Sequence, residues 1–142
     1  MSTLGKMPED VKALIEASPI MPQIPVIVRE RGQILNDLET VLAGLAIGVY
    51  VLPILPVAPI QGAPFIFFQR AEVRVRVIEN RKLNATGVDA YQVAEAVCLA
   101  LQGSNPGDIL AAPLEVATFE LNEDAQGISL DCIFHAAFQL NP

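Results

Sequence analysis

Three residues near the C-terminus are of the types that form a hydrolytic triad: Ser129, Asp131 and His135. His135 is the only histidine in the chain. The three residues occupy alternating positions of one extended segment, about 6–7 Å apart per two-residue step, without the sharp turn that presents a nucleophilic serine. This spacing favours a solvated or hydrogen-bonded strand histidine. We therefore expect no catalytic residues, and we expect that the protein is not an enzyme.

Other familiar chemistry is also missing from the sequence. It contains no P-loop, no G-x-S-x-G, no G-x-G-x-x-G and no histidine or cysteine pair at metal-ligand spacing, so we expect no metal and no cofactor. Cys98 and Cys132 have no paired spacing, which favours buried thiols of a cytoplasmic protein over a disulfide.

Two groups of charged residues have alternative interpretations. The first group lies on an expected strand edge and turn, which favours a solvated hairpin over an acid–base pair; it comprises Glu115, Glu120, Glu123 and Asp124. The second group comprises Arg70, Arg74 and Arg76. These arginines are separated by even numbers of residues, so they share one strand face, on which Glu72 also lies. On a monomer that face is simply a soluble sheet face; in a ring it lines a channel or meets the acidic surface of a neighbour.

Composition limits the function further. The 142 residues fit one domain, 1–142, with 52% apolar and only 18% charged residues. So few charges favour a domain that hides part of its surface against copies of itself. The net charge of −7 argues against nucleic acid as a partner. The first ten residues lack the apolar segment of a secretory leader.

The stretch from Ala43 to Arg70 is apolar enough to raise the question of a membrane span. Prolines interrupt it at short intervals, at Pro53, Pro56, Pro59 and Pro64. Each proline inside a helix costs about 3 kcal/mol or more, and the part before Pro53 is about half the length of a span. We therefore expect this stretch to be soluble and folded into the domain, with no membrane partner.

The periodicity of apolar residues predicts the elements. Helices are expected over Pro8–Ser18, ended by Pro19, over about Gly32–Leu45, and from a cap at Asp89 with Gln92 to a stop at Gly103. Strands are expected over Ile24–Glu30, Tyr50–Val57, Ala71–Asn80, Leu114–Glu123 and Ile128–Leu140, with residues 104–113 as a linker. This order predicts an α+β fold, a two-layer sandwich of a mostly antiparallel sheet with helices on one face.

The proline-rich strand Tyr50–Val57 is the best candidate for an interaction surface. Its prolines are expected to place it at a sheet edge, where they discourage open-ended pairing but leave side chains free to pack on a neighbour. The predicted interaction residues are those of this strand and of the arginine face: Tyr50, Leu52, Leu55, Val57, Arg70, Arg74 and Arg76. We expect Leu55→Asp to disrupt oligomers without unfolding the monomer, and Arg74→Glu to lower partner binding more than stability.

The segments AEVRVRVIENRKLNATG and DAYQVAEAVCLALQG, with the two strands that follow, resemble small tail-assembly proteins of tailed bacteriophages and their prophage relatives. These include the tail terminator and tail completion proteins. The resemblance covers about Glu72 to Leu140. It implies a homo-oligomeric ring, typically a hexamer, that caps the tail tube and carries no catalytic residues. It also implies tail-tube or head–tail connector proteins as partners, with assembly in the cytoplasm and a final place in the virion tail.

Three functions remain open at this point. The first is a structural assembly protein of a phage or prophage tail. The alternative is a small-ligand-binding or accessory α+β domain of bacterial origin that uses the apolar proline-rich stretch as a pocket wall. The third is an enzyme whose site the sequence does not reveal.

Overall fold

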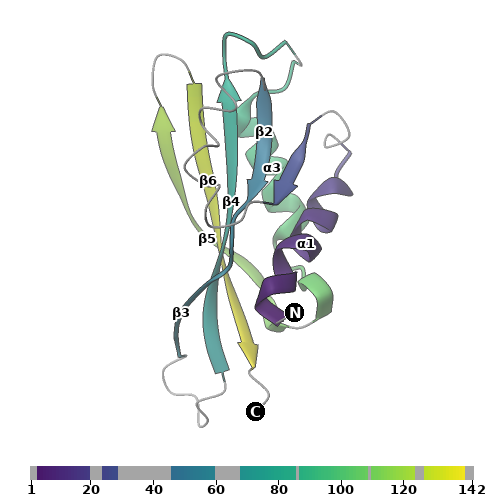
Figure 1. The fold of residues 1–142 in the computed structure, drawn as a ribbon, viewed down its shortest axis with the longest axis vertical. Helices are drawn as coiled ribbons and strands as arrows, with labels where there is room; N and C mark the ends of the chain where they lie inside the picture. The colour runs from purple at the N-terminus through teal and green to yellow at the C-terminus, as the bar shows by residue number, and fades with distance from the viewer. Residues whose placement is uncertain are drawn as a thin grey trace.

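The computed structural model describes residues 3–19, 24–28, 46–59, 68–85, 87–108, 110–123 and 127–139. The elements in chain order are α1 (Thr3–Glu16), β1 (Val26–Val28), β2 (Ile47–Val51), β3 (Leu55–Pro59), β4 (Phe68–Asn80), α3 (Ala90–Leu101), the short 3-10 helix η3 (Pro106–Asp108), β5 (Leu110–Glu123) and β6 (Gly127–Gln139). Figure 1 shows a long twisted sheet with the helices on one side of it. The predicted α+β class is confirmed.

The strands form one sheet in the order β1-β2-β4-β6-β5. Among the described strands, β1 and β2 pair in parallel and the other four pairings are antiparallel. β4 pairs along its whole length with β6. On its other side, β4 pairs first with β3, through Gln69 to Glu72, and then with β2, through Val75 to Glu79. The long strand β4 therefore joins the end of the sheet that contains β3 to the end that contains β2.

The core lies between the sheet and the two helices. In β4, valines alternate with charged residues, and Val73, Val75 and Val77 are fully buried on the helix side. Each helix contributes one apolar stripe to the same cluster: Met7, Val11 and Ile15 from α1, and Val93, Val97 and Leu101 from α3. The predicted alternation of buried and charged residues in this strand is confirmed.

The ends of α3 follow the prediction closely. The Asp89 side chain accepts a hydrogen bond from the Gln92 backbone, and the Gln92 side chain accepts one from the Asp89 backbone, each at 2.9 Å. This reciprocal pair satisfies two amides that a helix start would otherwise leave without partners. Gly103 follows the helix with φ of 76°, a conformation that favours glycine.

The first helix differs from the prediction. It begins at Thr3, so Pro8 lies inside it and does not mark its first turn. A proline removes one backbone hydrogen bond. The helix continues because its stripe of Met7, Val11 and Ile15 packs into the core, and packing of this kind supplies most of the stability of a helix in a protein.

The predicted edge strand Tyr50–Val57 is wrong in the structure. The chain forms two strands there, with Pro53 in the break between them. β2 contains no proline, so it can pair on both sides and lies between β1 and β4. Tyr50 and Leu52 are buried with Ile78 on the sheet face opposite the helices. The prolines at Pro56 and Pro59 fall in β3, whose only pairing among the described residues is with β4.

Other strand boundaries also differ from the prediction. The strand predicted over Ile24–Glu30 is only three residues long in β1, and β5 starts at Leu110, inside the predicted linker. The predicted helix Gly32–Leu45 and the predicted strand end at Leu140 lie outside the described residues.

The sheet extends further than the helices do. In Figure 1, β3, the beginning of β4 and the end of β6 project downward past α1 and α3. Among the residues described, no helix combines the length and the apolar character needed to cross a membrane.

Candidate interaction site

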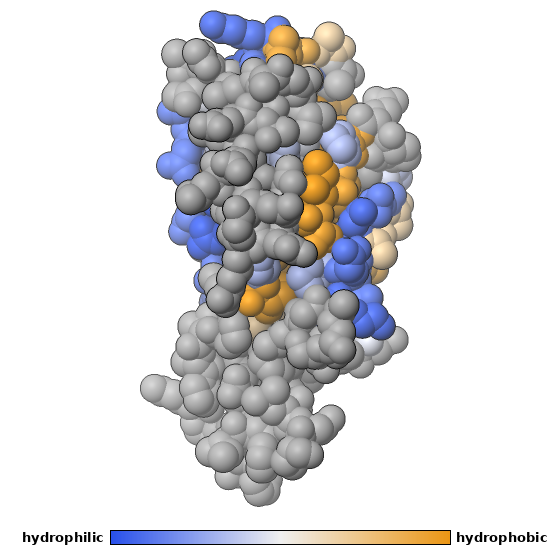
Figure 2. Space-filling model, viewed as in Figure 1, coloured by the Kyte–Doolittle hydropathy of each residue, from blue (hydrophilic) through white to orange (hydrophobic). Residues whose placement is uncertain are grey.

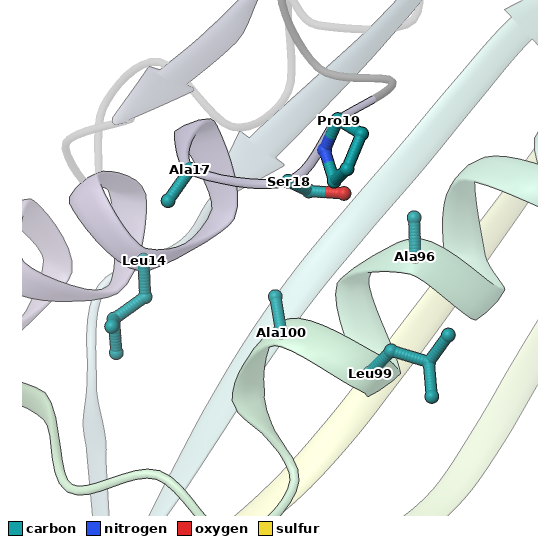
Figure 3. Close-up of a pocket in the computed structure, with 7 residues that line it drawn as sticks. All are labelled: Leu14, Ala17, Ser18, Pro19, Ala96, Leu99 and Ala100. Atoms are coloured by element: carbon teal, nitrogen blue, oxygen red, sulfur yellow. The ribbon is translucent and has the colours of Figure 1, made fainter.

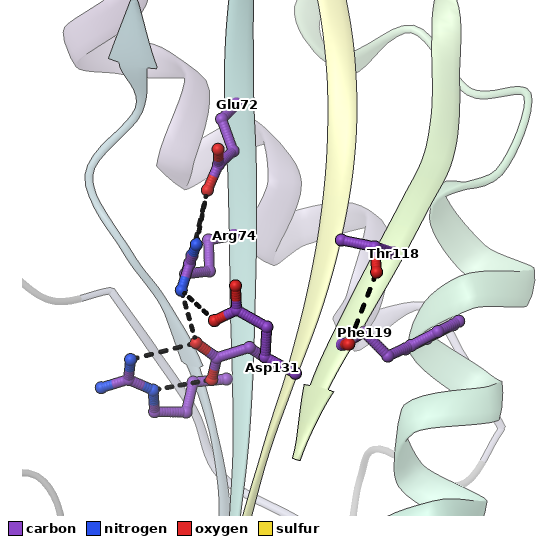
Figure 4. A network of polar contacts seen from close by, with 7 residues as sticks. Glu72, Arg74, Thr118, Phe119 and Asp131 are labelled. Carbon is purple, nitrogen blue, oxygen red and sulfur yellow. Dashed lines mark hydrogen bonds and ion pairs between the residues drawn. The ribbon is translucent and has the colours of Figure 1, made fainter. Parts of the chain in front are cut away.

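The predicted arginine face is occupied by carboxylates of the chain itself. The Arg74 guanidinium donates to Glu72 at 2.8 Å, to Glu120 at 2.9 Å and to Asp131 at 3.0 Å. Arg76 donates to the two oxygens of Asp131 at 2.7 and 3.0 Å. Figure 4 shows how these side chains from β4, β5 and β6 converge on the sheet face opposite the helices.

Strand register explains this cluster. Arg76 lies directly opposite Asp131 in the β4–β6 pair, and Glu120 lies opposite Asp131 in the β5–β6 pair. The Asp131 side chain is only 3% exposed, so its charge depends on the arginines. Partial burial acts to lower the pKa of Arg74, but its hydrogen bonds to Glu72 and Asp131 outweigh this and raise the pKa above its ordinary value. Both arginines are thus engaged inside the chain.

The structure separates the remaining predicted interaction residues. Tyr50 and Leu52 are buried within the fold. Leu55 and Val57 lie in β3, next to the start of β4, where Arg70 is opposite Ala58. Leu55, Val57 and Arg70 therefore lie in one region of the sheet, at the end that projects past the helices in Figure 1.

The three triad-type residues lie on one face of β6 as predicted, because they alternate with residues of the core. His135 is exposed, as expected, and Asp131 is bound to Arg74 and Arg76. Asp131 therefore stabilises two arginines, and the structure shows no contact through which it would orient His135 as a base.

The two cysteines are free thiols at the contact between α3 and β6. Cys132 is buried and Cys98 is half-buried. A hydrogen bond from Cys132 lowers the pKa of Cys98, against partial burial and the nearby Glu95 carboxylate, which both raise it. The same bond and burial raise the pKa of Cys132. Within the described ranges, no group of three or more histidine, cysteine or acidic side chains could hold a metal ion.

The structure also contains an apolar surface that we did not predict. Leu99 of α3 is 84% exposed and has a hollow on each side. The first hollow, of about 520 Å³, lies between α1 and α3 and is lined by Leu14, Ala17, Ser18, Pro19, Ala96, Leu99 and Ala100 (Figure 3). The second, of about 380 Å³, lies between α3 and β5 and is lined by Tyr91, Ala94, Glu95, Cys98, Leu99 and Phe119.

Leu99 stands as a ridge between the two hollows. Apolar exposure is not confined to this ridge. Tyr91, Phe119 and Leu121 are each about half exposed. Figure 2 shows apolar atoms at the surface of one face, with hydrophilic residues along one side of them. The sequence held a signal for the ridge, because Leu99 falls outside the buried stripe of α3, but one leucine off a stripe is common and needs no explanation.

Comparisons with known proteins bear on the fold. No protein-family model and no curated protein sequence matches the chain. A solved chain from the virion of a native gene transfer agent particle is similar in structure, with a TM-score of 0.67 at 16% identity over 99% of this chain and 100% of that chain. A second solved structure has a TM-score of 0.49 at 15% identity and covers 94% of this chain and 96% of its own. A third, from Akkermansia muciniphila, has a TM-score of 0.40 at 8% identity and covers 96% of this chain and 78% of its own. At these identities the first likeness shows a shared fold along the full length of both chains.

Proposed function

We propose that the protein is a structural assembly protein of a phage-like particle, of the tail terminator or tail completion type, and that it is not an enzyme. The observation that carries this proposal is the fold shared from end to end with a chain of a gene transfer agent virion. A match that leaves almost no residue of either chain uncovered supports a component of the same size and architecture, not a common module placed in a different protein.

The surface chemistry supports the same proposal. On the sheet face, Arg74 binds Glu120 and Asp131 of the same chain. Four of the five large exposed apolar residues described lie on α3 or in the second half of β5: Tyr91, Leu99, Phe119 and Leu121. Surfaces that will be covered by another protein chain are apolar at their centre. An assembly protein accounts for Leu99, Phe119 and Leu121 more directly than an enzyme does.

In this proposal the subunits form a closed head-to-tail ring, with six copies as the expected number, and the ring binds tail-tube or head–tail connector proteins. Such a ring needs two different patches on each subunit. We propose β3 at the projecting end of the sheet, with Leu55, Val57 and the neighbouring Arg70, as one of them and the ridge at Leu99 as the other. The subunits would assemble in the cytoplasm and end in the virion tail.

The experiment that tests this is the mass of the purified protein by light scattering, with negative-stain microscopy of the same fractions. We expect rings for the natural protein and smaller species for Leu55→Asp, with an unchanged circular dichroism spectrum. A protein that stays monomeric at high concentration, also when tail-tube subunits are added, would exclude the ring.

One observation favours a second candidate, a small-ligand-binding domain. The two hollows beside Leu99 are large enough for a small apolar ligand. The described residues of their walls come from α1, the turn after it, α3 and β5. A thermal-shift screen with fatty acids and aromatic compounds separates the two functions, because a pocket of this kind gains stability from its ligand whereas an assembly surface gains it from protein.

A further inference from the structure

The outer side of β5 is closed along its first half. Residues that follow α3 bond to it there: Ser104 accepts from the Leu114 amide at 2.8 Å, and the Gly103 amide donates to Leu114 at 2.9 Å. Nearby, the Gln102 side chain accepts from the Val116 amide at 2.7 Å. These contacts satisfy backbone groups that an end strand would otherwise leave open.

The second half of β5 is different. Ala117 to Glu123 are seven consecutive exposed residues in a strand that ends the sheet. The structure gives this segment no backbone hydrogen bond to any described residue outside β6. From Thr118 to Glu123 the pairing with β6 is regular, so alternate amides and carbonyls face away from the sheet. We call this segment, Thr118–Glu123, the open edge.

The helix side of the open edge is apolar at Phe119 and Leu121 and ends at Glu123, which binds Arg81. Phe119 and Leu121 lie opposite Cys132 and Leu130, which belong to the core, so their side chains project on the side of α3. Figure 4 shows Phe119 extending from β5 toward that helix. Phe119 also lines the hollow beside Leu99. An apolar floor therefore continues from the open edge to the ridge.

The opposite side of the same strand is acidic. Glu115 and Glu120 lie opposite His135 and Asp131 and project away from the helices. Glu115 is exposed, and the Glu120 side chain is 53% exposed although it binds Arg74. With a chain charge of −7, this side attracts cations.

We propose that the open edge receives an extended strand of another protein, in which apolar side chains alternate with lysine or arginine. The incoming backbone would use the outward-facing amides and carbonyls of Thr118–Glu123, and it would displace the long hydrogen bond, 3.5 Å, that the Thr118 hydroxyl donates to the Phe119 carbonyl. Because side chains of a strand alternate between faces, its apolar residues would pack on Phe119 and Leu121 while its basic residues meet Glu120. Glu115 lies beyond the open edge and adds negative charge on the same face. The charge of the edge selects a basic partner strand over a second copy of this acidic chain. This inference does not depend on the ring.

The test uses the full-length protein and a short capped peptide that alternates lysine and valine. Binding is followed by fluorescence anisotropy, and the site by backbone amide shifts in NMR. We expect saturable binding, amide shifts in Thr118–Glu123 and near Leu99, and about tenfold weaker affinity in about 0.5 M salt than at low salt. The same peptide with alternate backbone nitrogens methylated should not bind, because it lacks the strand amides. A peptide that alternates glutamate and valine should bind at least about tenfold more weakly.

Matched variants locate the contact. Leu121→Ser should weaken binding about fivefold. Leu83→Ser in the turn after β4 is the matched control, because Leu83 is 47% exposed and Leu121 is 48% exposed, and it should have no effect on binding. Glu115→Gln combined with Glu120→Gln should reduce both affinity and its salt dependence, and Glu16→Gln on α1 should change neither. The proposal is overturned if the methylated peptide binds equally well, if the amide shifts lie elsewhere, or if self-association occupies the edge and the peptide cannot displace it.

Discussion

Asp131→Asn tests the most concrete energetic statement that the structure allows. Asn keeps the shape of the side chain but removes the charge that Arg74 and Arg76 share at 2.7–3.0 Å. Removing one partner of a fully buried ion pair costs about 3–5 kcal/mol. Both arginines keep 24% of their side-chain exposure, so water screens part of the uncompensated charge.

We therefore expect Asp131→Asn to lower the free energy of unfolding by about 2–3 kcal/mol. For a chain of this length that corresponds to a fall in Tm of about 6–9 °C. The measurement is urea unfolding followed by circular dichroism, with the free energy obtained by linear extrapolation.

Glu120→Gln is the matched control for that measurement. It is the same chemical change on a carboxylate that also binds Arg74, but its side chain is 53% exposed. Exposed ion pairs contribute little, so we expect a change within about 0.5 kcal/mol. The reasoning is refuted if Asp131→Asn costs less than about 1 kcal/mol, or if the two variants cost the same. The same contacts imply that Arg74→Glu lowers stability at least as much as partner binding, which reverses the expectation from the sequence.

Three further predictions concern the helix α3. Glu79→Gln should cost about 1–2 kcal/mol of unfolding free energy, measured by urea unfolding, because this buried carboxylate accepts the first amide of the helix at 3.1 Å. Leu99→Ser should leave Tm nearly unchanged and lower the mass found by light scattering, whereas Leu101→Ser, at a fully buried position, should lower Tm by about 10 °C. Iodoacetamide should alkylate Cys98 before Cys132, as seen by mass spectrometry. Because the pKa of Cys98 is lowered, its thiolate forms, and its reaction begins, at a lower pH than for an ordinary cysteine. Equal labelling of both thiols in the folded protein would contradict this.

The sequence predicted the elements whose signals are local. Alternation in β4 and β6 and the capping pair of Asp89 and Gln92 depend on neighbouring residues only, and each was confirmed. Burial of Val73, Val75 and Val77 followed directly from that alternation. The fold class followed from the order of these elements.

The features that were missed depend on residues distant in the sequence. The prolines predict that Tyr50 is part of an edge, but strand order depends on which strands pair, and Tyr50 pairs on both sides through a proline-free segment. The role of Asp131 was also hidden, because its partners Arg74 and Arg76 are 57 and 55 residues away. No periodicity in a single sequence reports such pairs.

β3 and β2 each pair with one part of the long strand β4, and this arrangement has a mechanical consequence. At about 3.3 Å per residue, its 13 residues span about 43 Å, from the projecting end of the sheet to the body under the helices. β6 runs beside it for the whole distance, and their hydrogen bonds lie across the strand axis. A pull along that axis would load all of these bonds in shear at once, so none would have to yield first. The projecting end can thus transmit tension into the body of the protein without peeling away from it.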